Sequence, residues 1–182
     1  MTSAAQARII AAALGLFARH GVGGTSLQMI ADEIGVSKAA VYHQYKTKEE
    51  IVRAVALDEL AAVEAVLAEA EAKASPAEAR DAALQGMVDL AVTRRRQTTS
   101  ILSDPVIGRL FARDKHLHQV MSRLNRLLMG PDGGPDSHLE TAMLTAAISG
   151  AVMHPLVSKR DDETLRAQLT LLARRFLGVN GG

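Results

Sequence analysis

Apolar residues recur every three or four positions along most of the chain, which is the spacing of amphipathic helices. The first pattern ends before Gly21, a residue suited to the left-handed end of a helix. Residues 47–50, 75–78 and 137–140 each have the residue order of a capping box, which opens a helix. No segment has a convincing strand period. The expected helices cover residues 4–20, 25–34, 38–44, 47–74, 75–98, a short segment from 104, 112–129, 137–158 and 162–177, about nine in all.

Two short helices follow the first one closely. Residues 25–28 form a further capping box, in which the Thr25 hydroxyl caps the second helix and Gln28 reaches back. This helix is expected to stop at Gly35, and Ser37 then caps the third. The pattern therefore predicts an all-α chain that begins with a compact group of three helices.

Composition narrows the class of protein. Of 182 residues, 48% are apolar and 3% aromatic, which favours a packed helical core over disorder or a β-fold. The chain has no cysteine, so disulfides, thiolate zinc sites and cysteine nucleophiles are excluded. No apolar run approaches the roughly 20 residues of a membrane span, and the first residues lack the order of a signal peptide. We therefore expect a cytoplasmic protein with no membrane partner.

Charge is segregated along the chain although the net charge is only +1. Residues 54–93 hold two basic residues against eight acidic ones, whereas residues 94–126 hold eight against two. The overall charge therefore argues neither for nor against a nucleic-acid partner, and the placement of individual residues has to decide.

Residues 25–44 have the residue order that a helix-turn-helix requires. Ala31 is small enough for two helices to cross closely, Gly35 can take the left-handed turn, and Val41 anchors the second helix. The third helix would then expose mostly polar and small residues, namely Lys38, Ala39, Ala40, Tyr42, His43 and Gln44. A short polar helix of this kind suits an element that enters a DNA groove.

Several residues around these helices are candidates for contacts with phosphates. Thr25 and Ser26 stand at a helix N-terminus, which binds anions well. Lys48 opens the fourth helix, an unfavourable place for a cation unless a phosphate lies nearby. The phenol of Tyr42 is long enough to reach the DNA backbone. These side chains are predicted to hold the duplex against the third helix.

Residues 8–52, from Arg-Ile-Ile-Ala-Ala-Ala-Leu-Gly-Leu-Phe through Thr-Ser-Leu-Gln-Met-Ile-Ala-Asp-Glu-Ile-Gly-Val-Ser-Lys-Ala-Ala-Val-Tyr-His-Gln-Tyr-Lys-Thr-Lys-Glu-Glu-Ile, resemble the DNA-binding domain of the TetR family of bacterial repressors. Gln44 and Tyr45 stand where that family usually has His-Phe. The resemblance implies a helix-turn-helix domain over residues 1–47 and a helical effector-binding and dimerisation domain over 48–182. By position it implies DNA contacts at Thr25, Ser26, Ser37, Lys38, Ala40, Tyr42, His43 and Lys48.

The last two expected helices, 137–158 and 162–177, are candidates for a homodimer interface. The first is apolar on more than one side and has a stripe of small residues, and a helix of this kind needs two neighbours. Two helices from each subunit would form a four-helix interface, as in similar proteins of the family. The alternative is that both helices close a core within one chain.

An effector pocket is expected among the helices of the larger domain. Few aromatic residues are available to stack on a flat ligand, which favours an aliphatic one, and the run Arg94–Arg96, with Arg109 or Arg113, suits an anionic group. The alternative is that the apolar candidates are ordinary core residues and that the arginines form a solvated face. The candidate wall residues are Met87, Leu90, Leu102, Phe111, His116, Met121, Leu124, Met143 and His154.

The sequence offers no constellation for catalysis. His116 and His118 point to different sides of a helix, and no Glu-x-x-His pair is present, so neither a metal nor another cofactor is expected. The predicted function is a ligand-responsive transcriptional regulator, a repressor that a small molecule releases from a palindromic operator in double-stranded DNA. The alternatives are a helical protein-interaction module without DNA binding and a helical enzyme.

Overall fold

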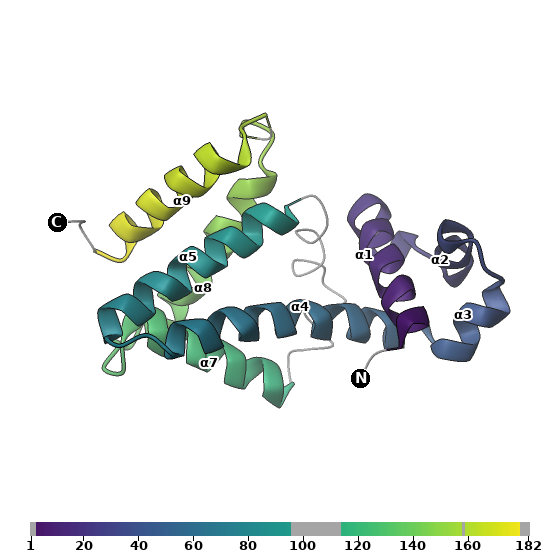
Figure 1. Cartoon of the computed structure of the whole chain (residues 1–182), viewed down its shortest axis with the longest axis horizontal. Coiled ribbons are helices and arrows are strands. Elements are labelled where there is room, and N and C mark those ends of the chain that lie inside the picture. Colours follow the sequence, from purple (N-terminus) through teal and green to yellow (C-terminus); the bar gives the residue numbers. More distant parts are fainter. Residues whose placement is uncertain (1–2, 96–113, 158, 179–182) are drawn as a thin grey trace. The chain divides into compact units, whose positions relative to one another are not determined.

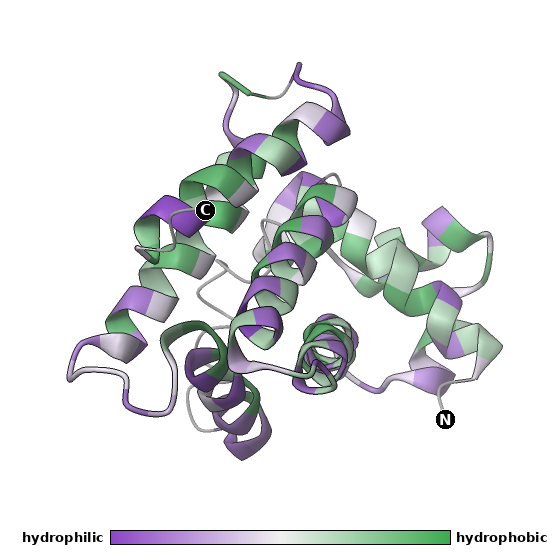
Figure 2. Cartoon of the chain, turned by 60° about the vertical axis from the view of Figure 1, so that its left-hand side comes forward, coloured by the Kyte–Doolittle hydropathy of each residue, from purple (hydrophilic) through white to green (hydrophobic). Residues whose placement is uncertain are grey.

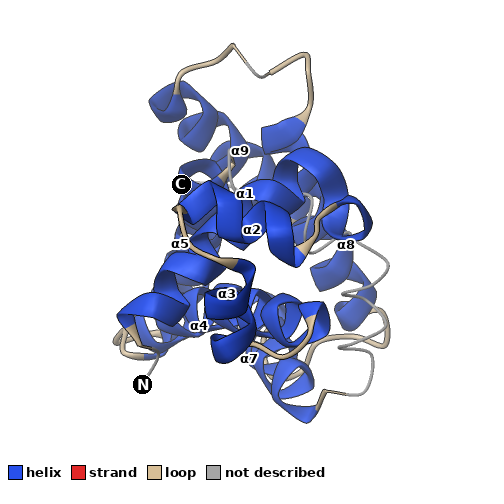
Figure 3. Cartoon of the chain, turned by 90° about the vertical axis from the view of Figure 1, so that its right-hand side faces the viewer, coloured by secondary structure: helices blue, strands red, loops and turns tan. Residues whose placement is uncertain are grey.

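The computed structural model describes residues 3–95, 114–157 and 159–178, and every regular element among them is an α-helix (Figures 1 and 3). The predicted all-α fold is therefore confirmed. The expected short helix from residue 104 lies outside the described residues. The described helices are α1 (Ala4–Gly24), α2 (Leu27–Ile34), α3 (Lys38–Gln44), α4 (Lys48–Glu71), α5 (Pro76–Arg94), α7 (Lys115–Met129), α8 (Ser137–Met153) and α9 (Asp162–Phe176).

The chain divides into two compact units. The first contains the described residues up to Glu59 together with Asp114, and the second contains Leu60–Arg95 and the described residues from Lys115 onward. Helix α4 contributes residues to both units. Each unit has a hydrophobic core of its own, and Figure 2 shows polar and apolar residues on different sides of several helices.

The core of the N-terminal unit is built from one face of each of its helices. Phe17 of α1, Ile30 and Ala31 of α2, and Val41 of α3 are at most 1% exposed. Ile51 and Val52 of α4 are buried to the same degree. Burial of these side chains holds the short helices α2 and α3, which would not be stable as isolated peptides.

Two of the predicted helix caps have the expected geometry. The Ser37 hydroxyl accepts a hydrogen bond from the Ala40 N–H at 3.2 Å. Ser75 and Glu78 form a complete capping box, in which each side chain accepts a hydrogen bond from the other residue's N–H. These caps are local in sequence, and the sequence pattern predicted both correctly.

Two other predicted caps are wrong. Helix α2 is capped by Ser26, whose hydroxyl accepts from the Met29 N–H, whereas Gln28 bonds to Asp32. Helix α8 is preceded by Asp136, which makes no side-chain cap. In both places the predicted capping residue, Thr25 or Ser137, is buried and bonds to another partner. The demands of the core therefore overrode the local capping signal.

Only one of the two hydrogen bonds predicted for the capping box at residues 47–50 forms. The Thr47 hydroxyl accepts from the Glu50 N–H at 3.1 Å, as predicted. The Glu50 carboxylate accepts from the N–H of Lys46, at 2.7 Å, in place of Thr47. Both hydrogen bonds thus join the connection between α3 and α4 to Glu50, in the first turn of α4.

The core of the C-terminal unit is aliphatic. It is formed by the inward faces of α4, α5, α7, α8 and α9. Leu67, Val88 and Leu124 are fully buried in it. Gly86 of α5 lies against Val66 of α4, and a Cβ at this glycine would overlap the Val66 Cγ1 atom. The missing side chain therefore allows these two helices to approach closely.

A small polar cluster joins α7 to α8 inside this core. The Thr141 hydroxyl donates to Asn125 Oδ1 at 2.8 Å, and Asn125 Nδ2 donates to the Ser137 hydroxyl at 3.4 Å. All three residues are less than 8% exposed. Because buried polar groups are costly without partners, these bonds fix how the two helices meet.

Several helices end earlier than the periodicity predicts. Helix α8 ends at Met153 and not near residue 158, because Pro155 follows and cannot continue a helix. Helix α4 ends at Glu71 and α5 at Arg94. Helix α9 ends close to the expected position, and Gly178 after it has a φ of 67°.

Candidate nucleic-acid interface

The turn between α2 and α3 is a glycine-dependent helix stop. Gly35 takes the left-handed conformation, with φ 69° and ψ 38°, and its N–H donates to Asp32. The Val36 N–H donates to the Ala31 carbonyl at 3.0 Å, which completes a Schellman motif. Ala31 and Val41, on the two sides of the turn, are fully buried. The predicted helix-turn-helix geometry is therefore present.

One face of α3 is exposed. Lys38, Ala39, Ala40, Tyr42 and His43 are all exposed, whereas Gln44 is half-buried. Ser37, the capping residue, is exposed as well. The structure thus brings five of the predicted contact residues, Ser37, Lys38, Ala40, Tyr42 and His43, together on one short element.

The two tyrosines at the end of α3 have opposite environments. Tyr42 is 51% exposed, and the Lys46 ammonium lies 5.3 Å from the centroid of its ring. Tyr45 is buried, and burial raises the pKa of its phenol. Tyr45, which stands where phenylalanine is usual in the family pattern, therefore acts as a core anchor, and Tyr42 is the residue that solvent can reach.

Thr25 and Ser26 differ in the same way. Ser26 is exposed at the start of α2. Thr25 is 2% exposed, and its hydroxyl donates to the Gly21 carbonyl at 2.9 Å. This bond ties Thr25 to the end of α1, where Gly21 interrupts the helix with a φ of 71°. The Thr25 hydroxyl thus has a partner within the unit.

Lys48 is engaged with backbone oxygens. Its ammonium donates to the carbonyls of Val22, Gly23 and Thr25 at 3.0, 3.5 and 3.2 Å. The negative end of α1 therefore supplies the partner that a cation at the start of α4 needs. A cation at the start of α4 therefore has acceptors within the unit, and the phosphate contact of Lys48 stays a prediction.

Sequence reasoning did not identify two residues that shape this unit. Arg8 donates to the Ile34 carbonyl at the end of α2 and links α1 to the turn. Lys46 lies four residues after Tyr42 and contacts its ring. The spacing of four residues was the signal in the sequence from which this contact could have been predicted. No local pattern marks Arg8, because its partner is 26 residues away.

The predicted effector residues that the structure describes have different environments. Leu124 is in the core, Met87 and Leu90 are half-buried against it, and Met121, Met143 and His154 are exposed. Leu102 and Phe111 lie outside the described residues, as do Arg96, Arg109 and Arg113. Arg95 pairs with Asp162 at 2.6 Å.

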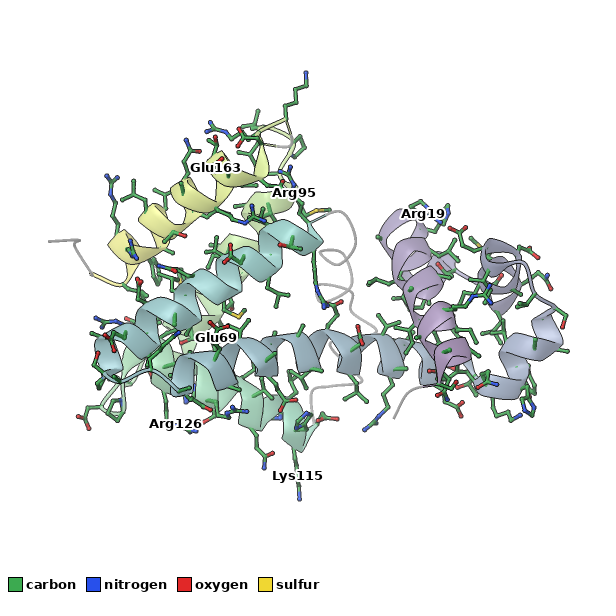
Figure 4. All side chains as sticks on the ribbon, viewed as in Figure 1. Arg19, Glu69, Arg95, Lys115, Arg126 and Glu163 are labelled. Atoms are coloured by element: carbon green, nitrogen blue, oxygen red, sulfur yellow. The ribbon has the colours of Figure 1, made fainter. Side chains whose placement is uncertain are left out.

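One open cleft lies on the C-terminal unit. It has a volume of about 460 Å³ and is lined by Glu64 of α4 and by residues of α7, among them the predicted residue His116 and also Arg126, labelled in Figure 4. Arg123, also in the lining, makes two hydrogen bonds to Glu71 at 2.7 and 3.0 Å. These bonds lower the pKa of Glu71. Arg123, one of the cations that line the cleft, is thus already paired with a carboxylate.

Two further properties concern the described residues alone. No three histidine or acidic side chains among them are arranged to hold a metal ion. No helix among them is long and apolar enough to cross a bilayer.

Known proteins share this architecture. Residues 9–55 match the family model described as bacterial regulatory proteins, tetR family. A tetR-family regulatory protein from Rhodococcus RHA1 has 25% identity and a TM-score of 0.72, with 99% of this chain and 100% of that one covered. The fatty acid degradation regulator FadR from Bacillus halodurans has 18% identity and a TM-score of 0.76, with 98% and 97% covered. No curated protein sequence matches the chain.

An exposed face of α3, next to a turn whose anchors are buried, is the arrangement of a DNA-binding transcriptional regulator. Residues 9–55 match the DNA-binding domain of the TetR family of bacterial regulatory proteins, as the residues around the turn indicated.

Proposed function

We propose that this protein is a ligand-responsive repressor, which binds a palindromic operator as a homodimer in the cytoplasm and is released by a small molecule. The observation that carries the proposal is the exposed polar face of α3 on a turn whose anchors, Ala31 and Val41, are fully buried. A rigid base beneath a polar helix supports insertion of α3 into the major groove.

The proposed DNA contacts divide by chemistry. Lys38, Ala40 and His43 are candidates for base edges in the groove, and Ser26, Ser37 and Tyr42 for phosphates. Thr25 and Lys48 stay candidates for phosphate contacts, and within the unit they also hold the connection between α1 and α2. Residues 1–47 would then form the DNA-binding domain, and residues 48–182 the effector-binding and dimerisation domain.

The proposed dimer interface lies on α8 and α9, within residues 137–158 and 162–177. Both helices expose large apolar side chains, which a monomer in water would not favour. Ala142, Ala146 and Gly150 are exposed on α8 and would permit a close approach of the partner. The exposed fractions support this assignment: Leu139 60%, Met143 54%, Leu171 51%, Leu172 57% and Phe176 48%.

The proposed effector is an aliphatic molecule with an anionic group, such as a fatty acid or its thioester. The scarcity of aromatic residues and the basic stretch 94–126 support this class. The name of the Bacillus halodurans neighbour, a fatty acid degradation regulator, agrees with it. The effector would act by binding more tightly to the state that does not bind DNA. A shift from 1:99 to 99:1 requires about 5.5 kcal/mol of differential affinity.

The DNA-binding proposal is tested by selecting duplexes from a random library with the purified protein. We expect enrichment of a palindrome with half-sites one helical turn or a multiple of it apart. Lys38→Ala should weaken the selected complex by at least about tenfold, whereas Lys159→Ala, an exposed lysine of the C-terminal unit, should leave it unchanged. Binding without sequence preference at moderate salt would contradict the proposal.

The effector proposal is tested on the complex with the selected duplex. Saturated fatty acids of increasing chain length, and their coenzyme A thioesters, are titrated against it. Release should depend on chain length and on the carboxylate or thioester group, while the matching alcohols should be inactive. Equal release by the alcohols would remove the anionic requirement, and no release by any of these compounds would exclude this effector class.

A further inference from the structure

The connection between α3 and α4 presents a cation, Lys46, whose ammonium has no carboxylate partner among the residues that the structure describes. Lys46 is exposed, and its ammonium lies 5.3 Å from the centroid of the Tyr42 ring. No ion pair of this ammonium occurs within residues 3–95, 114–157 and 159–178. A cation within about 6 Å of an aromatic face is attracted to it, so the Tyr42 ring orients the lysine.

The backbone beneath this lysine is fixed. The Lys46 N–H donates to the Glu50 carboxylate at 2.7 Å, and the Glu50 N–H donates to the Thr47 hydroxyl at 3.1 Å. Tyr45, the preceding residue, is buried and anchors the chain in the core. The side chain of Lys46 therefore starts from a fixed backbone position, and it extends over Tyr42 on the exposed face of α3.

Lys48, two residues later, is the useful contrast. Its ammonium donates to backbone carbonyls within the unit, at 3.0 and 3.2 Å for the two shorter bonds. Among residues 3–95, 114–157 and 159–178, the Lys46 ammonium makes no such bond, at a position the sequence pattern did not single out.

We propose that Lys46 is a further DNA-contact residue, which binds a backbone phosphate beside Tyr42 and is held there by the tyrosine ring. This inference rests on the proposed DNA binding and deepens it. The Tyr42 phenol donates a hydrogen bond to a phosphate oxygen, and the adjacent ammonium supplies the positive charge that displaces a counterion. Such a contact carries affinity and register but no sequence preference.

The test is the salt dependence of binding to the selected duplex, measured by fluorescence anisotropy for the wild type and for Lys46→Gln. Loss of one phosphate contact in each of two heads should lower the slope of log K against log salt by roughly 1.8, and weaken binding by about ten- to hundredfold at moderate salt. Lys46→Arg should retain the slope. Lys159→Gln, which removes the same charge from the C-terminal unit, should also retain it.

The role of the ring is tested in a Tyr42→Leu background. There the Lys46→Gln change should cost less affinity than in the wild type, because the lysine is no longer oriented. Equal losses in both backgrounds would overturn the positioning by Tyr42. An unchanged slope in Lys46→Gln, with the wild type still bound, would overturn the phosphate contact alone. A wild type that selects no duplex would overturn the proposed function as well.

Discussion

The ammonium nitrogen of Lys48 lies 3.0 Å from the carbonyl oxygen of Val22. The first residue of α4 is thereby joined to the C-terminal end of α1, across 26 positions of sequence. Because α2 and α3 lie between these residues in the chain, the bond closes a loop that contains the whole helix-turn-helix.

Lys48→Met should destabilise the N-terminal unit. It removes the charged donor from three carbonyl oxygens, two of them in part-buried hydrogen bonds, and we expect a loss of about 1–2 kcal/mol in the free energy of unfolding, measured with urea. Lys38→Met, an exposed lysine of α3 in the same unit, should change it by less than about 0.5 kcal/mol. Equal stabilities for the two variants would show that the Lys48 bonds contribute nothing.

Leu172→Glu should weaken the proposed homodimer. The residue is 57% exposed on α9, and a carboxylate buried against a partner would be strongly unfavourable. We expect the dissociation constant to rise by at least about 30-fold, equivalent to about 2 kcal/mol, in sedimentation velocity experiments. Met121→Glu, which places the same charge on exposed α7, should leave the dimer intact. Dissociation by Met121→Glu but not by Leu172→Glu would move the interface away from α9.

Thr141→Val should destabilise the C-terminal unit by about 1–3 kcal/mol in urea unfolding, because it removes the donor to the buried Asn125 Oδ1. The shape of the side chain is nearly conserved, so the loss reports the hydrogen bond and not a cavity. Thr93→Val, the same change at an exposed position of α5 whose hydroxyl accepts an exposed hydrogen bond from Arg166 at 3.3 Å, serves as the control and should cost less than about 0.5 kcal/mol. A similar cost at both positions would mean that the buried cluster is not a stabilising feature.

The pairing of Glu71 with Arg123 should make stability depend on pH. The Arg123 hydrogen bond lowers the pKa of Glu71, so the pair stabilises the folded state above the ordinary carboxylate pKa and the contribution is lost as pH falls through the lowered value. Glu71→Gln should cost less than about 1 kcal/mol at neutral pH, because the pair is solvent-exposed in part, and should cost nothing at strongly acidic pH.

Urea unfolding of Glu71→Gln across this pH range provides the measurement. Glu69→Gln on the same helix is the control, because its carboxylate is 78% exposed and lies 3.7 Å from Lys73. It should change stability less at neutral pH. A Glu71→Gln deficit that persisted at acidic pH would assign the effect to packing and not to charge.

The sequence predicted best where the signal and its partner are neighbours in the chain. Ser37 caps α3 and Gly35 ends α2 because both act on residues within the same turn. The fold class followed from the apolar spacing for a similar reason, since each amphipathic face is set by residues three and four apart.

Prediction was wrong where a distant partner decided the outcome. Thr25 and Ser137 have good capping side chains, but each is buried and bonded to a residue that local reasoning does not consider. The carbonyl acceptors of Lys48 were likewise not foreseen, because they lie 23 to 26 positions earlier in the chain; its phosphate contact stays a prediction. The predicted effector residues stay a prediction, because helical spacing identifies an apolar face without telling what that face meets.

The close approach of Gly86 to Val66 constrains how these two sites can change during evolution. A side chain acquired by the glycine would overlap the Val66 Cγ1 atom, so the valine would have to turn away or be replaced by a smaller residue. The same glycine would gain room for a methyl group once residue 66 is alanine, whereas alanine at 66 alone leaves a cavity. Substitutions at these two positions are therefore expected to depend on each other.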